Sequence, residues 1–226
     1  DSSRISLTVA ARTKAGSLPR CVSKTNQDIF LVEKNFDKSK YLFAVADGHG
    51  QNGHLVSQFI KLNLKSNWFA NLDSIENAWK LYNHLEYKID SALREGIINM
   101  SENLDETHID CGLSGSTLVT VTIIGNNISC ANVGDSRAVM GSLINGIFVS
   151  KALTVDQKPD LQTEKDRILK KGGKVHPYID DRGHSNGPSR VWLQTDDIPG
   201  LAMSRSIGDK VARRVGVIPD PGSFIK

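Results

Sequence analysis

The feature that most constrains the fold is a pair of apolar, β-branched segments joined by a turn signal. Residues 118–124 and 128–133 flank the tight-turn sequence Gly-Asn-Asn at 125–127. Such a turn joins antiparallel neighbours, because a parallel pair would need a far longer connection. Alternating apolar and polar residues predict further short strands at 5–10, 28–33, 41–46, 138–142 and 146–151. The chain should therefore contain antiparallel sheet.

Two long helical patterns interrupt these strands. Apolar residues recur every three or four positions over about 52–70 and again over about 74–100. Asp73 or Ser74 would cap the second helix. A shorter helix is predicted over 160–171, where two glycines end it. Strands, then long helices, then strands again indicate an α+β fold with segregated helices rather than alternating βαβ units.

Composition excludes several classes of protein. The 226 residues are 39% apolar and 23% charged, which is typical of a globular domain. A net charge of +3 without a basic stripe argues against a nucleic-acid partner, and no apolar run approaches the length of a membrane span. Cys21, Cys111 and Cys130 form no C-x-x-C pair, so neither a disulfide framework nor a zinc site is indicated. An intracellular location, cytoplasmic or nuclear, is expected.

The strongest chemical signal lies at residues 43–50, where an apolar strand leads into Asp47-Gly48-His49-Gly50. A carboxylate from Asp47 and a backbone carbonyl from Gly48 are hard oxygen donors, which suit Mg²⁺ or Mn²⁺. His49 could act as an acid or base near neutral pH. An ordinary turn is the competing interpretation, because Asp-Gly is common in turns.

Two further segments place polar side chains at strand ends. Gln27-Asp28 opens one strand, and Gly134-Asp135-Ser136 follows another. Taken singly, each also fits a strand cap or a β-turn with no chemistry.

Taken together, these segments resemble the protein phosphatase 2C family, in the same order and over essentially the whole chain. The matching segments are 27–28, 43–50, 115–117, 131–139, 153–159, 164–175, 190–192, 199–209 and 217–221. The resemblance implies an antiparallel β-sandwich flanked by helices in α-β-β-α layers. It also implies hydrolysis of phosphoserine and phosphothreonine in a phosphoprotein substrate, by water activated between two Mg²⁺ or Mn²⁺ ions.

Site roles follow from the resemblance, position by position. The positions that it assigns to metal ions are Asp28, Asp47, Gly48 and Asp156, the last for a third, weaker ion. Those expected to support the ligands are Gln27, Thr117 and Asp135. His49 would protonate the leaving oxygen. Lys24, or alternatively Arg20, would bind phosphate, because Ser23 stands where many members carry an arginine; for Lys24 a solvated surface lysine is the competing interpretation.

Departures from the family pattern lead to a second hypothesis. Gln27 offers a neutral oxygen where many members have a glutamate, which would weaken one metal site. The family's late acidic turns would lie beyond residue 226. We therefore expect residues 1–226 to form a single catalytic domain that is truncated at its C-terminal end, with a flap at about 177–200. Bare strand edges would favour domain swapping or dimerisation. The alternative function is a catalytically impaired pseudophosphatase that serves as a binding or scaffold module.

Overall fold

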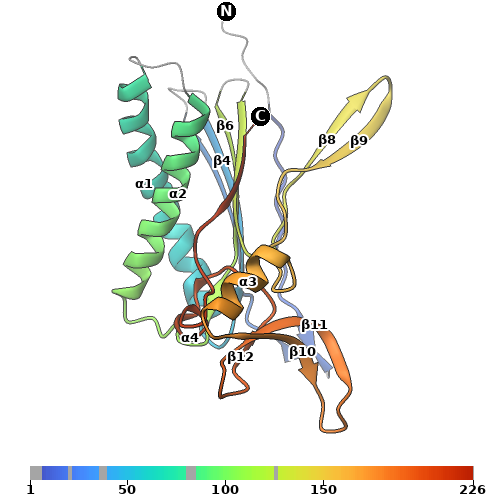
Figure 1. The fold of residues 1–226 in the computed structure, drawn as a ribbon. Helices are drawn as coiled ribbons and strands as arrows, with labels where there is room; N and C mark the ends of the chain where they lie inside the picture. Colours follow the sequence, from blue (N-terminus) through green and yellow to red (C-terminus); the bar gives the residue numbers. More distant parts are fainter. Residues whose placement is uncertain (1–6, 20–21, 36–39, 80–84, 125–126, 226) are drawn as a thin grey trace, which may run out of the picture.

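The structure, a computed structural model, describes residues 7–19, 22–35, 40–79, 85–124 and 127–225. A seven-stranded antiparallel sheet forms its centre, in the order β13-β5-β4-β6-β7-β14 with β3 paired to β4 (Figure 1). Its strands are β3 (Asp28–Asn35), β4 (Lys40–His49), β5 (Gly115–Ser116), β6 (Leu118–Ile124), β7 (Asn127–Val133), β13 (Ile207–Gly208) and β14 (Gly222–Ile225). The predicted β6–β7 hairpin is confirmed, since Leu118 pairs with Val133 and Ile124 with Asn127. Its turn, residues 125–126, lies outside the described residues.

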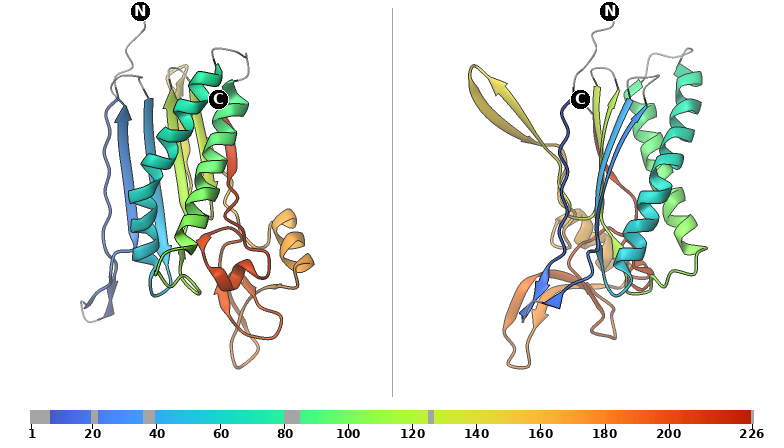
Figure 2. Two further views of the ribbon diagram at one scale, coloured as in Figure 1. Left: turned by 90° about the vertical axis from the view of Figure 1, so that its left-hand side faces the viewer. Right: turned by 180° about the vertical axis from the view of Figure 1, so that it is seen from behind.

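Two long helices, α1 (Gly53–Trp79) and α2 (Leu85–Asp105), cover one face of this sheet (Figure 2). The segregation of helices and antiparallel strands confirms the predicted α+β class. The predicted helix start at Asp73 or Ser74 is wrong, because α1 runs through both residues to Trp79. A capping residue alone does not end a helix, and the stretch from Asp73 to Trp79 contains no Gly or Pro to interrupt the backbone ladder. Among the described helices, none combines the length and the apolar character needed to cross a membrane.

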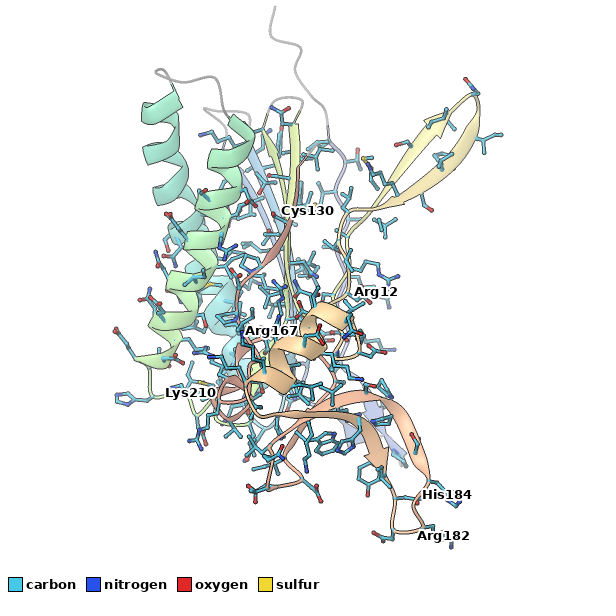
Figure 3. All side chains as sticks on the ribbon, in the orientation of Figure 1. Arg12, Cys130, Arg167, Arg182, His184 and Lys210 are labelled. Atoms are coloured by element: carbon cyan, nitrogen blue, oxygen red, sulfur yellow. The ribbon has the colours of Figure 1, made fainter. Side chains whose placement is uncertain are left out.

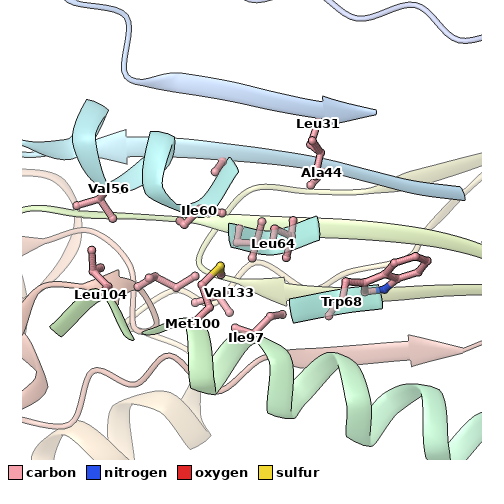
Figure 4. Close-up of a cluster of buried hydrophobic side chains, with 14 of the residues drawn as sticks. Leu31, Ala44, Val56, Ile60, Leu64, Trp68, Ile97, Met100, Leu104 and Val133 are labelled. Carbon is pink, nitrogen blue, oxygen red and sulfur yellow. The ribbon is translucent and has the colours of Figure 1, made fainter. Parts of the chain in front are cut away.

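The core lies between these helices and the sheet (Figure 4). Spacing of three or four residues places one apolar stripe of each helix against the strands. The buried residues of this stripe are Val56, Ile60, Leu64 and Trp68 from α1, and Leu93, Ile97, Met100 and Leu104 from α2. The sheet contributes Leu42, Leu118 and Val133 among others. This packing holds the start of α1 against the end of β4.

Replacing Ile97 with Val is expected to lower the free energy of unfolding by about 1 kcal/mol, because one buried methylene is removed from a packed core. Ile97 is 1% exposed. The matched control is Leu62→Val on α1, where the side chain is 68% exposed and the expected change is below about 0.5 kcal/mol. Urea unfolding of both variants measures the difference, and equal losses would contradict the placement of these two side chains.

The opposite face of the sheet is lined by the N-terminal segment, which runs along it in extended form (Figure 2). A strand was predicted at residues 5–10, but residues 5 and 6 lie outside the described residues and residues 7–10 form no strand. A strand needs a hydrogen-bonded neighbour, and none of the described strands pairs with this segment. Val9, Phe30, Val45 and Val121 line the groove between segment and sheet.

An apolar hairpin projects from the body of the molecule (Figure 1). It consists of β8 (Val139–Ile144) and β9 (Ile147–Ala152). Phe148 on this hairpin is 83% exposed, and Ile147 is 68% exposed. Such a surface agrees with the expectation of self-association, which stays a prediction.

The predicted flap, 177–200, is not a structureless loop. It belongs to a three-stranded antiparallel sheet, made of β10 (Lys174–Ile179), β11 (Ser185–Trp192) and β12 (Pro199–Leu201). Trp192 anchors it by stacking on His176, with 5.4 Å between ring centroids, and by donating from Nε1 to the His176 carbonyl at 2.9 Å. Figure 3 shows Arg182 and His184 at its far tip. The remaining elements are β1 (Ser17–Leu18), β2 (Val22–Ser23), α3 (Gln162–Lys170) and α4 (Lys210–Arg213).

Candidate active site

The pairing register of the neighbouring strands β3 and β4 brings the site residues together. Strand β3 begins at Asp28 and β4 ends at His49, so the antiparallel ladder sets Asp28 directly opposite Asp47. Directly opposed residues in such a ladder point to the same face, with Cβ atoms about 5 Å apart. Two carboxylates therefore meet at one end of the sheet, and their role as metal ligands stays a prediction.

Negative charge accumulates around Asp47. Burial raises the pKa of the Asp47 carboxyl above its usual value, and the charge of Asp28 and a hydrogen bond shared with it raise the pKa further. Asp135 adds a third negative charge, while His49 acts in the opposite direction. Carboxylates that repel one another in this way favour the uptake of a cation between them.

Backbone hydrogen bonds fix the position of Asp47. Its N–H donates to Thr117 Oγ1 and its carbonyl accepts from the Thr117 N–H, each at 3.0 Å. The Thr117 hydroxyl also bonds to Ser136 Oγ at 2.7 Å. Gln27 supports the next residue, since its carbonyl accepts from the Gly48 N–H at 3.1 Å. Thr117 and Gln27 thus hold the backbone at Asp47 and Gly48, and their role in supporting metal ligands stays a prediction.

Replacing Gly48 with Ala is expected to lower the free energy of unfolding by about 2 kcal/mol, because the new methyl group would overlap backbone atoms that cannot move easily. A Cβ at Gly48 would lie 2.4 Å from the Gly53 carbonyl oxygen and 2.8 Å from the Gln27 carbonyl oxygen. Gly141→Ala is the control, since a Cβ there meets nothing within 4 Å. Thermal unfolding compares the two, and an equally stable Gly48 variant would contradict the tight packing described here.

A short hydrogen bond connects His49 to a distant part of the chain. His49 Nε2 lies 2.6 Å from Asp209 Oδ2, whose side chain is 2% exposed. Burial lowers the pKa of His49, but the hydrogen bond to Asp209 and the charges of Asp209, Asp47 and Asp135 outweigh burial and raise the pKa above its usual value. His49 Nδ1 is buried and has no hydrogen-bond partner among the described residues. That nitrogen is available for a proton transfer.

Two predicted site residues lie apart from this group. Lys24 follows β2 on an exposed stretch, and within the described part of the chain its side chain forms no hydrogen bond or ion pair with Asp28 or Asp47. Asp156 forms a bidentate ion pair with Arg137, at 2.7 and 2.8 Å. This ion pair lowers the pKa of Asp156. The roles predicted for Lys24 and Asp156 stay predictions.

Sequence reasoning missed two members of the group. Asp209 pairs with His49, and Lys158 forms an ion pair with Asp135. Both belong to segments that the motif comparison had marked, namely 199–209 and 153–159. Position in a motif was the only available signal, because the contacts join residues far apart in the chain.

The donors at this strand end are the carboxylates of Asp28 and Asp47 and the nearby carbonyl of Gly48. Within the residues that the structure describes, no three His, Cys, Asp or Glu side chains form a ready-made metal cluster. Mg²⁺ does not require one, because it commonly binds through one or two carboxylates and keeps several waters. The donor set therefore fits a hard divalent cation.

Comparison with known proteins identifies the family. The family model described as "Protein phosphatase 2C" matches residues 13–223. "Probable protein phosphatase 2C 64" of Oryza sativa subsp. japonica is 38% identical over 209 residues, which are 88% of this chain and 46% of that protein. "Probable protein phosphatase 2C 52" of Arabidopsis thaliana is 35% identical over 223 residues, covering 87% of this chain and 47% of that protein.

Solved structures share the fold. A structure described as serine-threonine phosphatase 2C from Toxoplasma gondii superimposes with a TM-score of 0.76 at 22% identity, covering 90% of this chain and 69% of that chain. This likeness agrees with the predicted β-sandwich flanked by helices. The chain spans about half the length of the curated relatives it matches. On the family match and these relatives, the chain belongs to the protein phosphatase 2C family.

Proposed function

We propose that this chain carries the catalytic centre of a metal-dependent serine/threonine protein phosphatase. The observation that supports the proposal is the meeting of Asp28 and Asp47 at one strand end, beside a histidine held by Asp209. Oxygen donors beside a buried acid–base group are what hydrolysis of a phosphate ester needs, because the reaction depends on positioning and charge neutralisation.

Asp28, Asp47 and the Gly48 carbonyl would hold Mg²⁺ or Mn²⁺, and the family resemblance implies two such ions. When bound, the ions would neutralise phosphate charge and lower the pKa of an attacking water. Thr117 and Gln27 contribute by fixing the backbone on either side of Asp47. Ordered donors of this kind need little reorganisation during the reaction.

His49 supplies the proton in this proposal. As water attacks phosphorus and the bond to the seryl or threonyl oxygen breaks, Nδ1 of His49 in its doubly protonated imidazolium form would give its proton to that leaving oxygen. The hydrogen on Nε2 would stay on the ring, in the bond to Asp209, and His49 would become neutral. The products are inorganic phosphate and a free hydroxyl group, and no phosphoenzyme forms. Proton donation to a poor leaving group contributes roughly 10²–10⁴-fold to such rates.

Phosphate release from a phosphothreonine peptide tests this function. The full natural protein that contains this chain is assayed with Mn²⁺, and again with excess EDTA. We expect release that requires Mn²⁺ and stops with EDTA. A folded full-length protein that releases no phosphate at any Mn²⁺ concentration would overturn the proposal.

One observation favours the pseudophosphatase as a second candidate. Gln27 directs its amide nitrogen to the Gly50 carbonyl at 3.1 Å, and its Oε1 is buried without a hydrogen-bond partner among the described residues. A neutral amide here supplies no negative charge to an ion. Gln27→Glu distinguishes the candidates: a gain of activity from an inert native protein would favour the scaffold function, whereas robust native activity excludes it.

A further inference from the structure

Asp209 is an unusual residue that contacts His49 but is not among the candidate metal ligands. It is 1% exposed, and its backbone adopts the left-handed conformation with φ of 46°. This conformation is unfavourable for a residue with a Cβ. The surrounding structure therefore has to stabilise the position of this aspartate.

Several contacts hold the Asp209 carboxylate in one place. Ser206 Oγ donates to Asp209 Oδ2 at 2.5 Å, and the Asp209 backbone N–H donates to the Ser114 carbonyl at 2.9 Å. Gly115 leaves the necessary space, because a Cβ at that position would lie 2.2 Å from Asp209 Oδ2. Residues from separate segments of the chain therefore enclose the Asp209 carboxylate.

The same oxygen, Asp209 Oδ2, lies 2.6 Å from Nε2 of His49. A carboxylate accepts hydrogen bonds and cannot donate them, so Nε2 carries a hydrogen and points at Asp209. This leaves Nδ1 as the nitrogen that can face a substrate, and Nδ1 is buried with no partner among the described residues. The partner at one ring nitrogen sets the orientation and tautomer of a histidine.

We propose that Asp209 is a positioning residue, which orients the His49 ring so that Nδ1 meets the leaving oxygen of the substrate. The proposal rests on the proposed function, because it assigns Asp209 to the proton donation by His49. Asp209 touches neither substrate nor reacting atoms and acts through the histidine.

Substrates with different leaving groups can distinguish a positioning role of Asp209 from a purely structural role. Threonine leaves as an alkoxide, which needs a proton as the bond to phosphorus breaks. Nitrophenolate is a stable anion and leaves without one. Loss of His49 orientation should therefore slow hydrolysis of a phosphothreonine peptide and have little effect on nitrophenyl phosphate, whereas damage to the fold would slow both reactions.

The experiment measures kcat/KM on both substrates for the full natural protein and for Asp209→Asn, His49→Ala and the double variant. We expect Asp209→Asn to reduce peptide hydrolysis about 10–100-fold and nitrophenyl phosphate hydrolysis less than about threefold. In the His49→Ala background, Asp209→Asn should have almost no further effect, because two residues that act as one unit are not additive. Asp166→Asn, an exposed aspartate on α3, is the control and should match the native protein on both substrates.

Two other results would overturn the proposal: equal losses on the two substrates, or additive losses in the double variant. If Asp209→Asn fails to fold, Ser206→Ala decides, since it keeps the carboxylate and removes one of its donors. It should show the same substrate preference with a smaller loss, and equal losses on both substrates would again overturn the proposal.

A spectroscopic readout separates failure of this inference from failure of the proposed function. If the native protein is inert on both substrates, the function fails and the His49 ring nitrogens still report its orientation. Long-range ¹H–¹⁵N spectra should show a proton on Nε2 in the native protein and a changed tautomer pattern in Asp209→Asn. Identical His49 signals in the two proteins would contradict a positioning role.

Discussion

Replacing Asp47 with Asn is expected to reduce kcat for phosphothreonine-peptide hydrolysis by about 10³-fold or more. Asn has nearly the same shape, and the backbone bonds between Asp47 and Thr117 do not depend on the charge. The substitution therefore removes one negative oxygen and leaves the fold. A cation at a phosphoryl group contributes several kcal/mol, and each 1.4 kcal/mol is a factor of ten in rate.

Steady-state kinetics at saturating Mn²⁺ measure this loss, with Asp166→Asn as the control. Asp166 is exposed and accepts a hydrogen bond from Gln162 one helical turn away, at 2.7 Å. The control should keep native activity. An Asp47→Asn protein with native kcat would show that the paired carboxylates do not serve the reaction.

Replacing Glu164 with Gln is expected to lower the free energy of unfolding at pH 7 by about 3 kcal/mol. Glu164 on α3 is 3% exposed, and its carboxylate accepts from Arg205 Nη2 at 2.6 Å and from Arg167 Nη2 and Ser204 Oγ at 2.7 Å each. Figure 3 shows Arg167 on this helix. Removal of the negative charge would leave two half-buried guanidinium groups without their counter-ion.

The pH dependence of stability has a definite sign here. Burial raises the pKa of Glu164, but hydrogen bonds from Arg205, Arg167 and Ser204 prevail and lower the pKa from 4.5 to about 2. A lowered folded-state pKa stabilises the protein fully above the unfolded pKa, and this stabilisation, about 3 kcal/mol, is lost as pH falls from about 4.5 to about 2.

Urea unfolding at pH 7 and at stepwise lower pH tests both statements. The native protein should lose this contribution in acid, while Glu164→Gln should lack it at every pH. The control is Glu33→Gln, which breaks the exposed pair with Lys65 (2.8 Å) and should cost less than about 1 kcal/mol. Equal stability of native and Glu164→Gln proteins at pH 7 would contradict the described network.

Much of the fold follows from local patterns in the sequence. Apolar patterns located β3, β4, β6 and β7 within a few residues, and the turn signal at 125–127 predicted the antiparallel pairing of β6 with β7. The boundary between α1 and α2 was not predictable, since a capping signal competes weakly with a helix that packs along a sheet. The flap sheet was also missed, because its strands contain Gly and Pro and depend on the contact of Trp192 with His176.

The candidate site likewise contains a part that the sequence predicted and a part that it did not. Asp28, Asp47 and His49 lie at strand ends, so strand pairing alone brings them together. The His49–Asp209 contact joins residues 160 positions apart. Local sequence patterns could not predict it, because only the folded chain brings these two residues together. Asp156 lies beside Arg137 through the β8–β9 hairpin, a contact that its motif did not indicate, and its role as a metal ligand stays a prediction.

The central claim is that the carboxylates of Asp28 and Asp47 form a site for a divalent cation. Titration of the natural protein with Mn²⁺, followed by the electron paramagnetic resonance of the free ion, measures this binding directly. We expect saturable binding that Asp28→Asn and Asp47→Asn each weaken at least about tenfold, and that Asp166→Asn leaves unchanged. Equal Mn²⁺ affinity in all four proteins, or no binding by the native one, would contradict the claim.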